Sequence, residues 1–269
     1  MGIYKDIIYT DENFTICEKL NKKTDNIIFH ENTLCINENA FCDSNIKKIE
    51  FNDNITEIKN KAFFRCRELL EIKLPENLKS IGEATFSDCK KMHTVEFKNN
   101  VESIGPRAFS QCFNIKKIDL SKTKVLMLEE LTFFSCYKLK EILLPNDLRI
   151  ISKLSFANTP LERITLPENL KIIDFSAFTQ TNIEKVELPK NITHVSGMFI
   201  SSHNSKLRLV TCPEDTGLAV IEKLKNIFKG SGIEFKVIPA LDIDRFLYEG
   251  KTFKEINNVY KERKNKSTV

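Results

Sequence analysis

Residues Glu71 to Met92 read EIKLPENLKSIGEATFSDCKKM, and a close variant of this stretch begins again at Val95. The same pattern recurs every 22 to 24 residues from Ile27 to about Ile200, which gives eight copies. A repeat of this period is typical of a solenoid, because one coil cannot bury its apolar side without stacking on the next. The repeat therefore predicts the fold before any other feature of the sequence is considered.

Each copy carries its apolar residues at fixed places. Two apolar residues at alternate positions, such as Ile72 and Leu74, predict a strand with both side chains on one face. A second apolar pair follows, and then a Phe that is often preceded by Ala. At about 4.8 Å per coil, eight coils form a rod or arc of roughly 35–40 Å. The copies start at Ile27, Ile49, Ile72, Val95, Ile118, Ile142, Ile164 and Val186, and the Phe column is Phe41, Phe63, Phe86, Phe109, Phe133, Phe156, Phe178 and, in the last copy, Ile200.

The copies differ slightly in length. One has an additional residue near Thr123, and two are one residue shorter beyond Phe156 and Phe178. We expect local bulges at these places and no break in the solenoid.

The motif Leu-Pro-x-x-Leu-x-x-Ile-x-x-x-Ala-Phe-x-x-Cys-x-x-Leu resembles leucine-rich repeats of the BspA-like class, and the similarity covers about two-thirds of the chain. Its closest copies run from Glu71 to Met92 and from Ile164 to Ile183. The resemblance implies an α/β solenoid dominated by strands, wound as a right-handed leucine-rich-repeat superhelix. It also implies protein binding, with adhesion or host-surface interaction as the role.

Both ends of the repeat array have candidate caps, which solenoids need to protect their terminal coils. Residues 7–9 and 14–17, joined by a turn at Asp11, predict an N-terminal hairpin. A strand at 207–210, a helix capped by Asp215 and ending at Gly230, and a strand at 233–238 predict a C-terminal α/β cap. The apolar face expected for this helix is Leu218, Ile221, Leu224, Ile227 and Phe228.

Beyond Pro239, helical spacing of apolar residues from Ile243 to Tyr260 predicts a last helix that docks on the rod or recruits a partner. The predicted organisation is a hairpin cap at 1–26, a solenoid at 27–205, a strand–helix–strand cap at 206–240, and a helix with a basic tail at 241–269.

Charge and hydropathy exclude several classes of function. The chain has 41 Lys and Arg against 37 Asp and Glu, and the surplus lies in residues 251–269. The balanced body argues against a nucleic-acid binder. No apolar run approaches the roughly 18 residues of a membrane span, and no signal peptide is recognisable in the first 30 residues. If the chain is complete as given, the protein is expected in the cytoplasm. The family resemblance instead implies a protein that is secreted or displayed at the cell surface.

Four of the eight cysteines occupy one repeat position, three residues after the Phe: Cys66, Cys89, Cys112 and Cys136. Side chains in a column point the same way, whereas a disulfide needs convergent geometry and zinc needs four tetrahedral ligands. We expect a ladder of buried thiols and neither a metal site nor a cofactor.

No catalytic motif is recognisable. The four histidines, His30, His93, His194 and His203, form no HExxH pattern, and the chain contains no GxSxG or phosphate-binding loop. Carboxylates fall at variable repeat positions, so the sequence predicts a protein without enzymatic activity.

The first candidate binding surface is formed by residues that lie between the paired core positions of the first strand and must face outward. These residues mix both signs of charge, which is explained by cross-strand pairing for solubility or by a polar docking face. Leu143 interrupts the polar column. The candidates are Lys73, Glu96, Asp119 and Leu143.

The second candidate surface is an apolar stripe of Met127, Ile150 and Ile172, where other copies carry polar residues such as Ser80 and Ser103. If these side chains point outward, they form a patch for self-association or for a protein partner. If the additional residue near Thr123 shifts the register, or the C-terminal segment covers them, they are buried.

The sequence therefore predicts a protein–protein interaction module, with cell-surface adhesion or host interaction as its role. The alternative is an intracellular scaffold or regulatory adaptor that uses the repeat face or the C-terminal helix.

Overall fold

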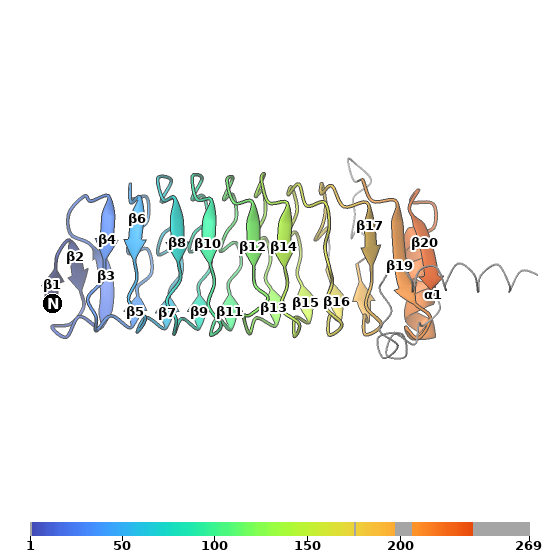
Figure 1. Cartoon of the computed structure of the whole chain (residues 1–269), viewed down its shortest axis with the longest axis horizontal. Helices are drawn as coiled ribbons and strands as arrows, with labels where there is room; N and C mark the ends of the chain where they lie inside the picture. Colours follow the sequence, from blue (N-terminus) through green and yellow to red (C-terminus); the bar gives the residue numbers. More distant parts are fainter. Residues whose placement is uncertain (1, 175, 197–205, 239–269) are drawn as a thin grey trace, which may run out of the picture.

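The computed structural model describes residues 2–174, 176–196 and 206–238, and these residues form an elongated solenoid of about nine turns (Figure 1). Short strands run across the long axis, with the N-terminal strands at one end of the rod and the helix at the other. The strand-dominated leucine-rich-repeat solenoid predicted from the repeat is confirmed.

Most coils contribute one strand to each of two columns, which Figure 1 shows as an upper and a lower row. The first column consists of β4 (Asn26–Ile28), β6 (Lys48–Glu50), β8 (Glu71–Lys73), β10 (Thr94–Glu96), β12 (Lys117–Asp119), β14 (Glu141–Leu143), β17 (Lys185–Glu187), β19 (Leu209–Pro213) and β20 (Glu234–Ile238). The second consists of β5 (Cys35–Ile36), β7 (Glu57–Ile58), β9 (Ser80–Ile81), β11 (Ser103–Ile104), β13 (Met127–Leu128), β15 (Ile150–Ile151), β16 (Ile172–Ile173) and β18 (His194–Val195). Pairing within both columns is parallel, because every coil runs in the same direction.

The core is a continuous stack of phenylalanine rings. From Phe41 to Phe178, neighbouring rings lie 5.0–5.7 Å apart between centroids and are nearly parallel. This spacing is close to the roughly 4.8 Å between adjacent strands, and each aromatic pair contributes about 0.5–1.5 kcal/mol beyond its burial. The predicted column is confirmed over these residues, whereas Ile200 lies outside the described residues.

The turns that carry the Phe residues form a third ladder between coils. Residues two positions before and after each Phe have positive φ, as in Lys61 (55°) and Arg65 (59°) around Phe63. L-residues adopt this conformation at a cost of roughly 1–2 kcal/mol. It lets the N–H groups of Lys61, Phe63 and Arg65 all donate to carbonyl groups of the next coil, at 2.8–3.0 Å. The same arrangement recurs around the stacked Phe residues that follow.

Both strand columns are interrupted at the coil with the additional residue near Thr123. The second column forms one sheet that ends at β11 and another that starts at β13, and in the first column β10 and β12 are not paired. The Phe stack and the turn ladder nevertheless cross this point, with Phe109 N–H donating to the Thr132 carbonyl at 3.0 Å. The irregularity therefore changes the outer walls and leaves the core continuous.

The strand predicted at Ile164 does not form. Residues 160–166 have no regular secondary structure, and they separate β14 from the sheet of β17, β19 and β20. The turn between Phe156 and Leu161 is one residue shorter than the corresponding turn between Phe133 and Leu139. It also contains Pro160, whose φ is fixed and which has no N–H to donate. The change in turn length at this coil moves the segment out of the ladder.

The N-terminal cap is a three-stranded meander. β2 (Ile7–Tyr9) pairs antiparallel with β3 (Ile16–Leu20), and β1 (Gly2–Tyr4), which the sequence did not predict, pairs with β2. β3 then pairs with β5 of the first coil. The buried Tyr9 hydroxyl lies 3.1 Å from the Thr33 hydroxyl and accepts a hydrogen bond from His30 N–H, so it joins the cap to the solenoid.

The C-terminal cap contains α1 (Leu218–Phe228) between β19 and β20. Two details of the prediction were wrong. The N-cap is Gly217, with no side-chain hydrogen bond, because the helix begins too far after Asp215 for its carboxylate to cap it. Leu218 is 80% exposed, whereas Ile221, Leu224 and Phe228 are buried. The helix and basic tail predicted at 241–269 lie outside the described residues.

Candidate protein-binding faces

The outward residues of the first strand column form what we call the strand face. In β6, β8, β10, β12, β14 and β17 the middle residue is buried and both neighbours are exposed. Lys73 lies directly opposite Glu96 across the ladder, and Asp119 lies opposite Leu143. The structure thus places all four predicted residues of this face at the surface, in two adjacent pairs.

Charge pairing explains only part of this face. Lys117 binds Glu141 across the ladder at 2.6 Å, and Lys48 and Lys185 bind glutamates on their own strands at 2.7 and 2.6 Å. These pairs are exposed, so each contributes little to the stability of the fold. Glu71 and Lys73, which carry opposite charges on the same strand, form no ion pair with each other in the described part of the chain.

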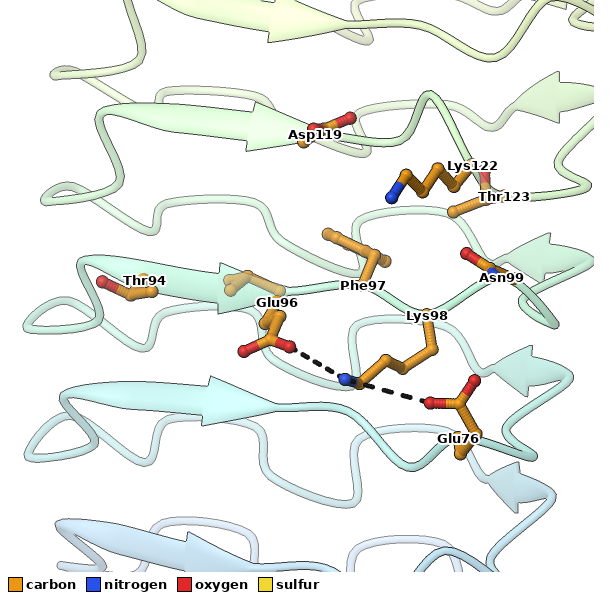
Figure 2. Close-up of a pocket in the computed structure, with 10 residues that line it drawn as sticks. Glu76, Thr94, Glu96, Phe97, Lys98, Asn99, Asp119, Lys122 and Thr123 are labelled. Atoms are coloured by element: carbon orange, nitrogen blue, oxygen red, sulfur yellow. Dashed lines mark hydrogen bonds and ion pairs between the residues drawn. The ribbon is translucent and has the colours of Figure 1, made fainter.

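A cleft of about 500 Å³ opens on the strand face where β10 and β12 are not paired (Figure 2). Glu96, Phe97 and Lys98 come from one coil, whereas Asp119 and Lys122 come from the next. Figure 2 shows the Lys98 amine between two carboxylates, with Nζ 2.8 Å from Glu96 Oε1 and 3.9 Å from Glu76 Oε2. We call this site the strand-face cleft.

Two acidic groups of the strand-face cleft, Glu96 and Asp119, remain ionised at neutral pH. The hydrogen bond from Lys98 lowers the pKa of Glu96. The Ser121 hydroxyl, 2.6 Å from Asp119 Oδ1, lowers the pKa of that carboxyl. The half-buried Phe97 was not predicted as part of a site, although the additional residue near Thr123 marked the position.

A second and larger groove, of about 850 Å³, lies on the same face around the segment that fails to form a strand. Its walls include Arg163 and Lys185, and its apolar residues include Ile164, Leu166 and Leu188. The sequence offered a signal here as well, because the shortened turn and Pro160 precede the groove.

The apolar stripe is in register but only half-buried. Met127 pairs with Ile150 and Ile150 with Ile172 on adjacent strands, whereas the inner residues Leu128 and Ile151 are fully buried. The sequence left two alternatives open, an exposed patch or a buried one. The structure shows an intermediate case, in which all three side chains are partly exposed. A depression of about 410 Å³ adjoins the stripe at Met127 and includes the exposed Leu126.

The cysteine column is structural. All eight cysteines are free, and Cys66, Cys89, Cys112 and Cys136 are fully buried. Each of these four thiols donates to the carbonyl of the Phe in the preceding coil, at 3.2–3.3 Å. Burial raises the pKa of Cys66 and Cys136 to about 12, so these thiols stay protonated and unreactive.

The described residues contain neither a metal-binding cluster nor a membrane-spanning helix. Within them, no cluster of three or more His, Cys, Asp or Glu side chains is arranged to hold a metal ion. The helix found among them is too short and too polar to cross a bilayer.

Solved structures of bacterial proteins share this architecture. A leucine-rich cell surface protein from Faecalibacterium prausnitzii is 18% identical, with a TM-score of 0.58 over 78% of this chain and 69% of its own. A leucine-rich repeat protein from Eubacterium ventriosum is 27% identical, with a TM-score of 0.60 over 67% of this chain and 49% of its own. One from Bacteroides ovatus is 20% identical, with a TM-score of 0.57 over 80% and 61%. This chain spans about half of the Eubacterium protein and about three-fifths of the Bacteroides protein.

No curated protein matches the chain closely enough to count as a relative. The family model for the BspA type leucine rich repeat region, however, matches six copies across residues 11–140 and 121–234, in agreement with the Phe stack and the two strand columns. The chain therefore belongs to the BspA-type leucine-rich-repeat family, whose repeats form protein-interaction modules.

Proposed function

We propose that this chain is a non-enzymatic protein-binding module, that its partner binds the strand face at the strand-face cleft, and that it serves in cell-surface adhesion or host interaction. The cleft is the observation that carries the proposal. It combines a half-buried aromatic ring with ionised carboxylates and two lysines. Interfaces concentrate binding energy in such central apolar positions ringed by polar groups.

The proposed role at the cell surface draws on the Faecalibacterium protein, which is described as a cell surface protein. An intracellular scaffold is the second candidate, and the eight free cysteines are the observation in its favour. Six of the eight are buried, however, so an oxidising compartment would reach few of them. Immunofluorescence of the native protein in intact and permeabilised cells separates the two roles. Staining that requires permeabilisation would contradict the surface role.

The binding site itself is tested by placing a photo-crosslinking residue at Thr94, in the cleft, and at Glu187, on the same face but outside it. We expect a crosslinked protein partner from Thr94 only. The affinity of the identified partner for the Glu96→Lys, Asp119→Lys double variant should then fall by at least tenfold, or about 1.4 kcal/mol. The matched control is Glu50→Lys with Glu187→Lys, which reverses the same charge elsewhere on the strand face. Equal affinities for the two double variants would contradict the proposed site.

A further inference from the structure

A small pocket on the turn side of the solenoid differs in chemistry from the strand face. It is a shallow, open depression of about 320 Å³, lined by Tyr137, Asn158, Thr159, Pro160, Gln180 and Asn182. We call it the turn-edge pocket. Its lining contains no charged side chain, whereas the strand-face cleft, the groove at Ile164 and the depression at Met127 all include both lysine and glutamate. Burying a charged ligand there would leave its charge without a partner, so the pocket favours a neutral one.

The pocket exists because two successive turns are short. Tyr137, Pro160 and Asn182 each follow a stacked Phe by four residues. The next coils reach their core residues Leu161 and Ile183 one residue sooner than the coil of Tyr137 reaches Leu139, which leaves space beside the tyrosine ring. The floor is fixed, since the Thr159 hydroxyl donates to the Phe156 carbonyl at 2.7 Å.

One wall of the pocket is an exposed aromatic platform. The Tyr137 ring packs against Phe113, with centroids 5.0 Å apart, and the Lys90 amine lies 5.2 Å from the Phe113 centroid. Tyr137 is nevertheless 57% exposed. An aromatic ring that is held in place from one side and open to solvent on the other presents a preformed stacking surface.

The remaining walls carry amide groups. Asn158 Nδ2 donates to the Ser135 hydroxyl at 3.3 Å, which orients that side chain and leaves its carbonyl oxygen available. Within the described part of the chain, no hydrogen bond engages the side chains of Gln180 and Asn182. An amide offers both donors and an acceptor on one rigid plane. A pyranose ring needs this combination, because it has an apolar C–H face and a rim of hydroxyl groups that each donate and accept.

We propose that the turn-edge pocket binds a neutral glycan, with a sugar ring stacked on Tyr137 and its hydroxyl groups bonded by Asn158, Gln180 and Asn182. The volume lies at the small end of the roughly 300–1,000 Å³ typical of ligand pockets, which suits one or two sugar rings. The site is separate from the strand face and independent of the partner proposed there. A protein of this kind would hold a glycosylated surface and a protein partner at the same time.

The test is a glycan array probed with the intact chain, followed by calorimetric titration with the neutral oligosaccharide that binds best. We expect Tyr137→Ala to weaken binding about tenfold or more and Tyr137→Phe to keep most of it, because stacking requires the ring and not the hydroxyl. Gln180→Ala and Asn182→Ala should each weaken binding severalfold. Glu96→Lys with Asp119→Lys, in the strand-face cleft, should leave it unchanged.

Circular dichroism and the unfolding midpoint of each variant verify that the fold is intact. The proposal is overturned if the array shows no neutral glycan, if only charged glycans bind, or if Tyr137→Ala binds as well as the parent chain. It is also overturned if the pocket takes proline-rich peptides instead, which a parallel peptide array would reveal.

Discussion

The coils between Ile49 and Lys116 and those between Ile118 and Glu187 share one core and differ in their walls. The regular coils keep Cys66, Cys89 and Cys112 in one column and pair their second strands without interruption. The irregular coils contain the additional residue near Thr123, two shortened turns, and a segment at 160–166 without a strand. The Phe stack passes through both regions with nearly constant spacing.

This difference separates stability from binding. The four surface cavities described above each have at least one wall in the irregular region. In the second column the regular coils close the wall by pairing neighbouring strands, and the coil with the additional residue interrupts that pairing without disturbing the stacked core. Small changes in coil length can thus create binding sites on a repeat scaffold with little loss of stability in the stacked core.

Phe109→Ala should have the largest effect, because Phe109 joins the two regions where both strand columns are interrupted. We expect a loss of about 3–5 kcal/mol in the free energy of unfolding, as for other buried Phe truncations. Limited proteolysis should also become fast near Thr123, since the Phe stack and the turn ladder cross this point whereas neither strand ladder does. Chemical denaturation and peptide mapping measure the two effects.

Phe63→Ala, within the regular region, is the matched control. It should lose similar stability but gain no cleavage near Thr123, because β7, β9 and β11 still pair around it. Identical cleavage maps for the two variants would show that the interruption of the strands has no energetic consequence.

The irregular region also contains the apolar stripe, and we propose that the stripe mediates self-association. Ile150→Asp with Ile172→Asp should reduce any concentration-dependent rise in mass measured by light scattering, at a stability cost of about 1–2 kcal/mol per half-buried residue. Ser80→Asp with Ser103→Asp places the same charges at equivalent positions of the regular region and should leave the mass unchanged. A parent chain that stays monomeric at high concentration would remove the idea.

The sequence predicted what repeats and located the departures from the repeat, but it did not predict how those departures change the walls. Phe63, Phe86 and Phe109 were placed correctly, because a side chain that recurs at one position must stack on its copies. The strand at Ile164 and the N-cap at Asp215 were predicted wrongly, because each depends on how one turn meets its neighbours. The clefts combine side chains from adjacent coils, so no single repeat contains the pattern that would identify them.

Cys136 offers a pH test of the buried thiol column. Burial raises its pKa to about 12, while the thiol of the unfolded chain ionises near pH 9. Between these values the unfolded chain binds fewer protons than the folded one, so stability is complete below pH 9 and falls as the pH rises towards 12. We expect a slope of about 1 kcal/mol per pH unit from this thiol.

Chemical denaturation of the parent chain and of Cys136→Ala at about pH 8, 9 and 10 measures that slope. These pH values stay below the lysine pKa of about 10.4, so lysine titration contributes little. The variant should be less stable at pH 8 and should lose stability less steeply above pH 9. Thr159→Ala, at the equivalent position of the next coil, should leave the slope unchanged because a hydroxyl does not titrate in this range. A parallel pH dependence in all three proteins would contradict a protonated thiol at this position.

The smallest expected effect concerns the turns that both regions share. Lys61 and Gln180 are exposed and have φ of 55° and 58°, so replacing either with glycine removes a strained L-residue conformation. Because glycine also loses more backbone entropy on folding, the net gain should be about 0.5 kcal/mol in each case. Lys79→Gly, at an exposed site without positive φ, should instead destabilise the chain slightly. Equal gains from Lys61→Gly and Gln180→Gly, measured by chemical denaturation, would mean that the turn backbone is the same in the regular and irregular coils. A gain in only one region would locate the difference between them in the turns themselves and not in the walls alone.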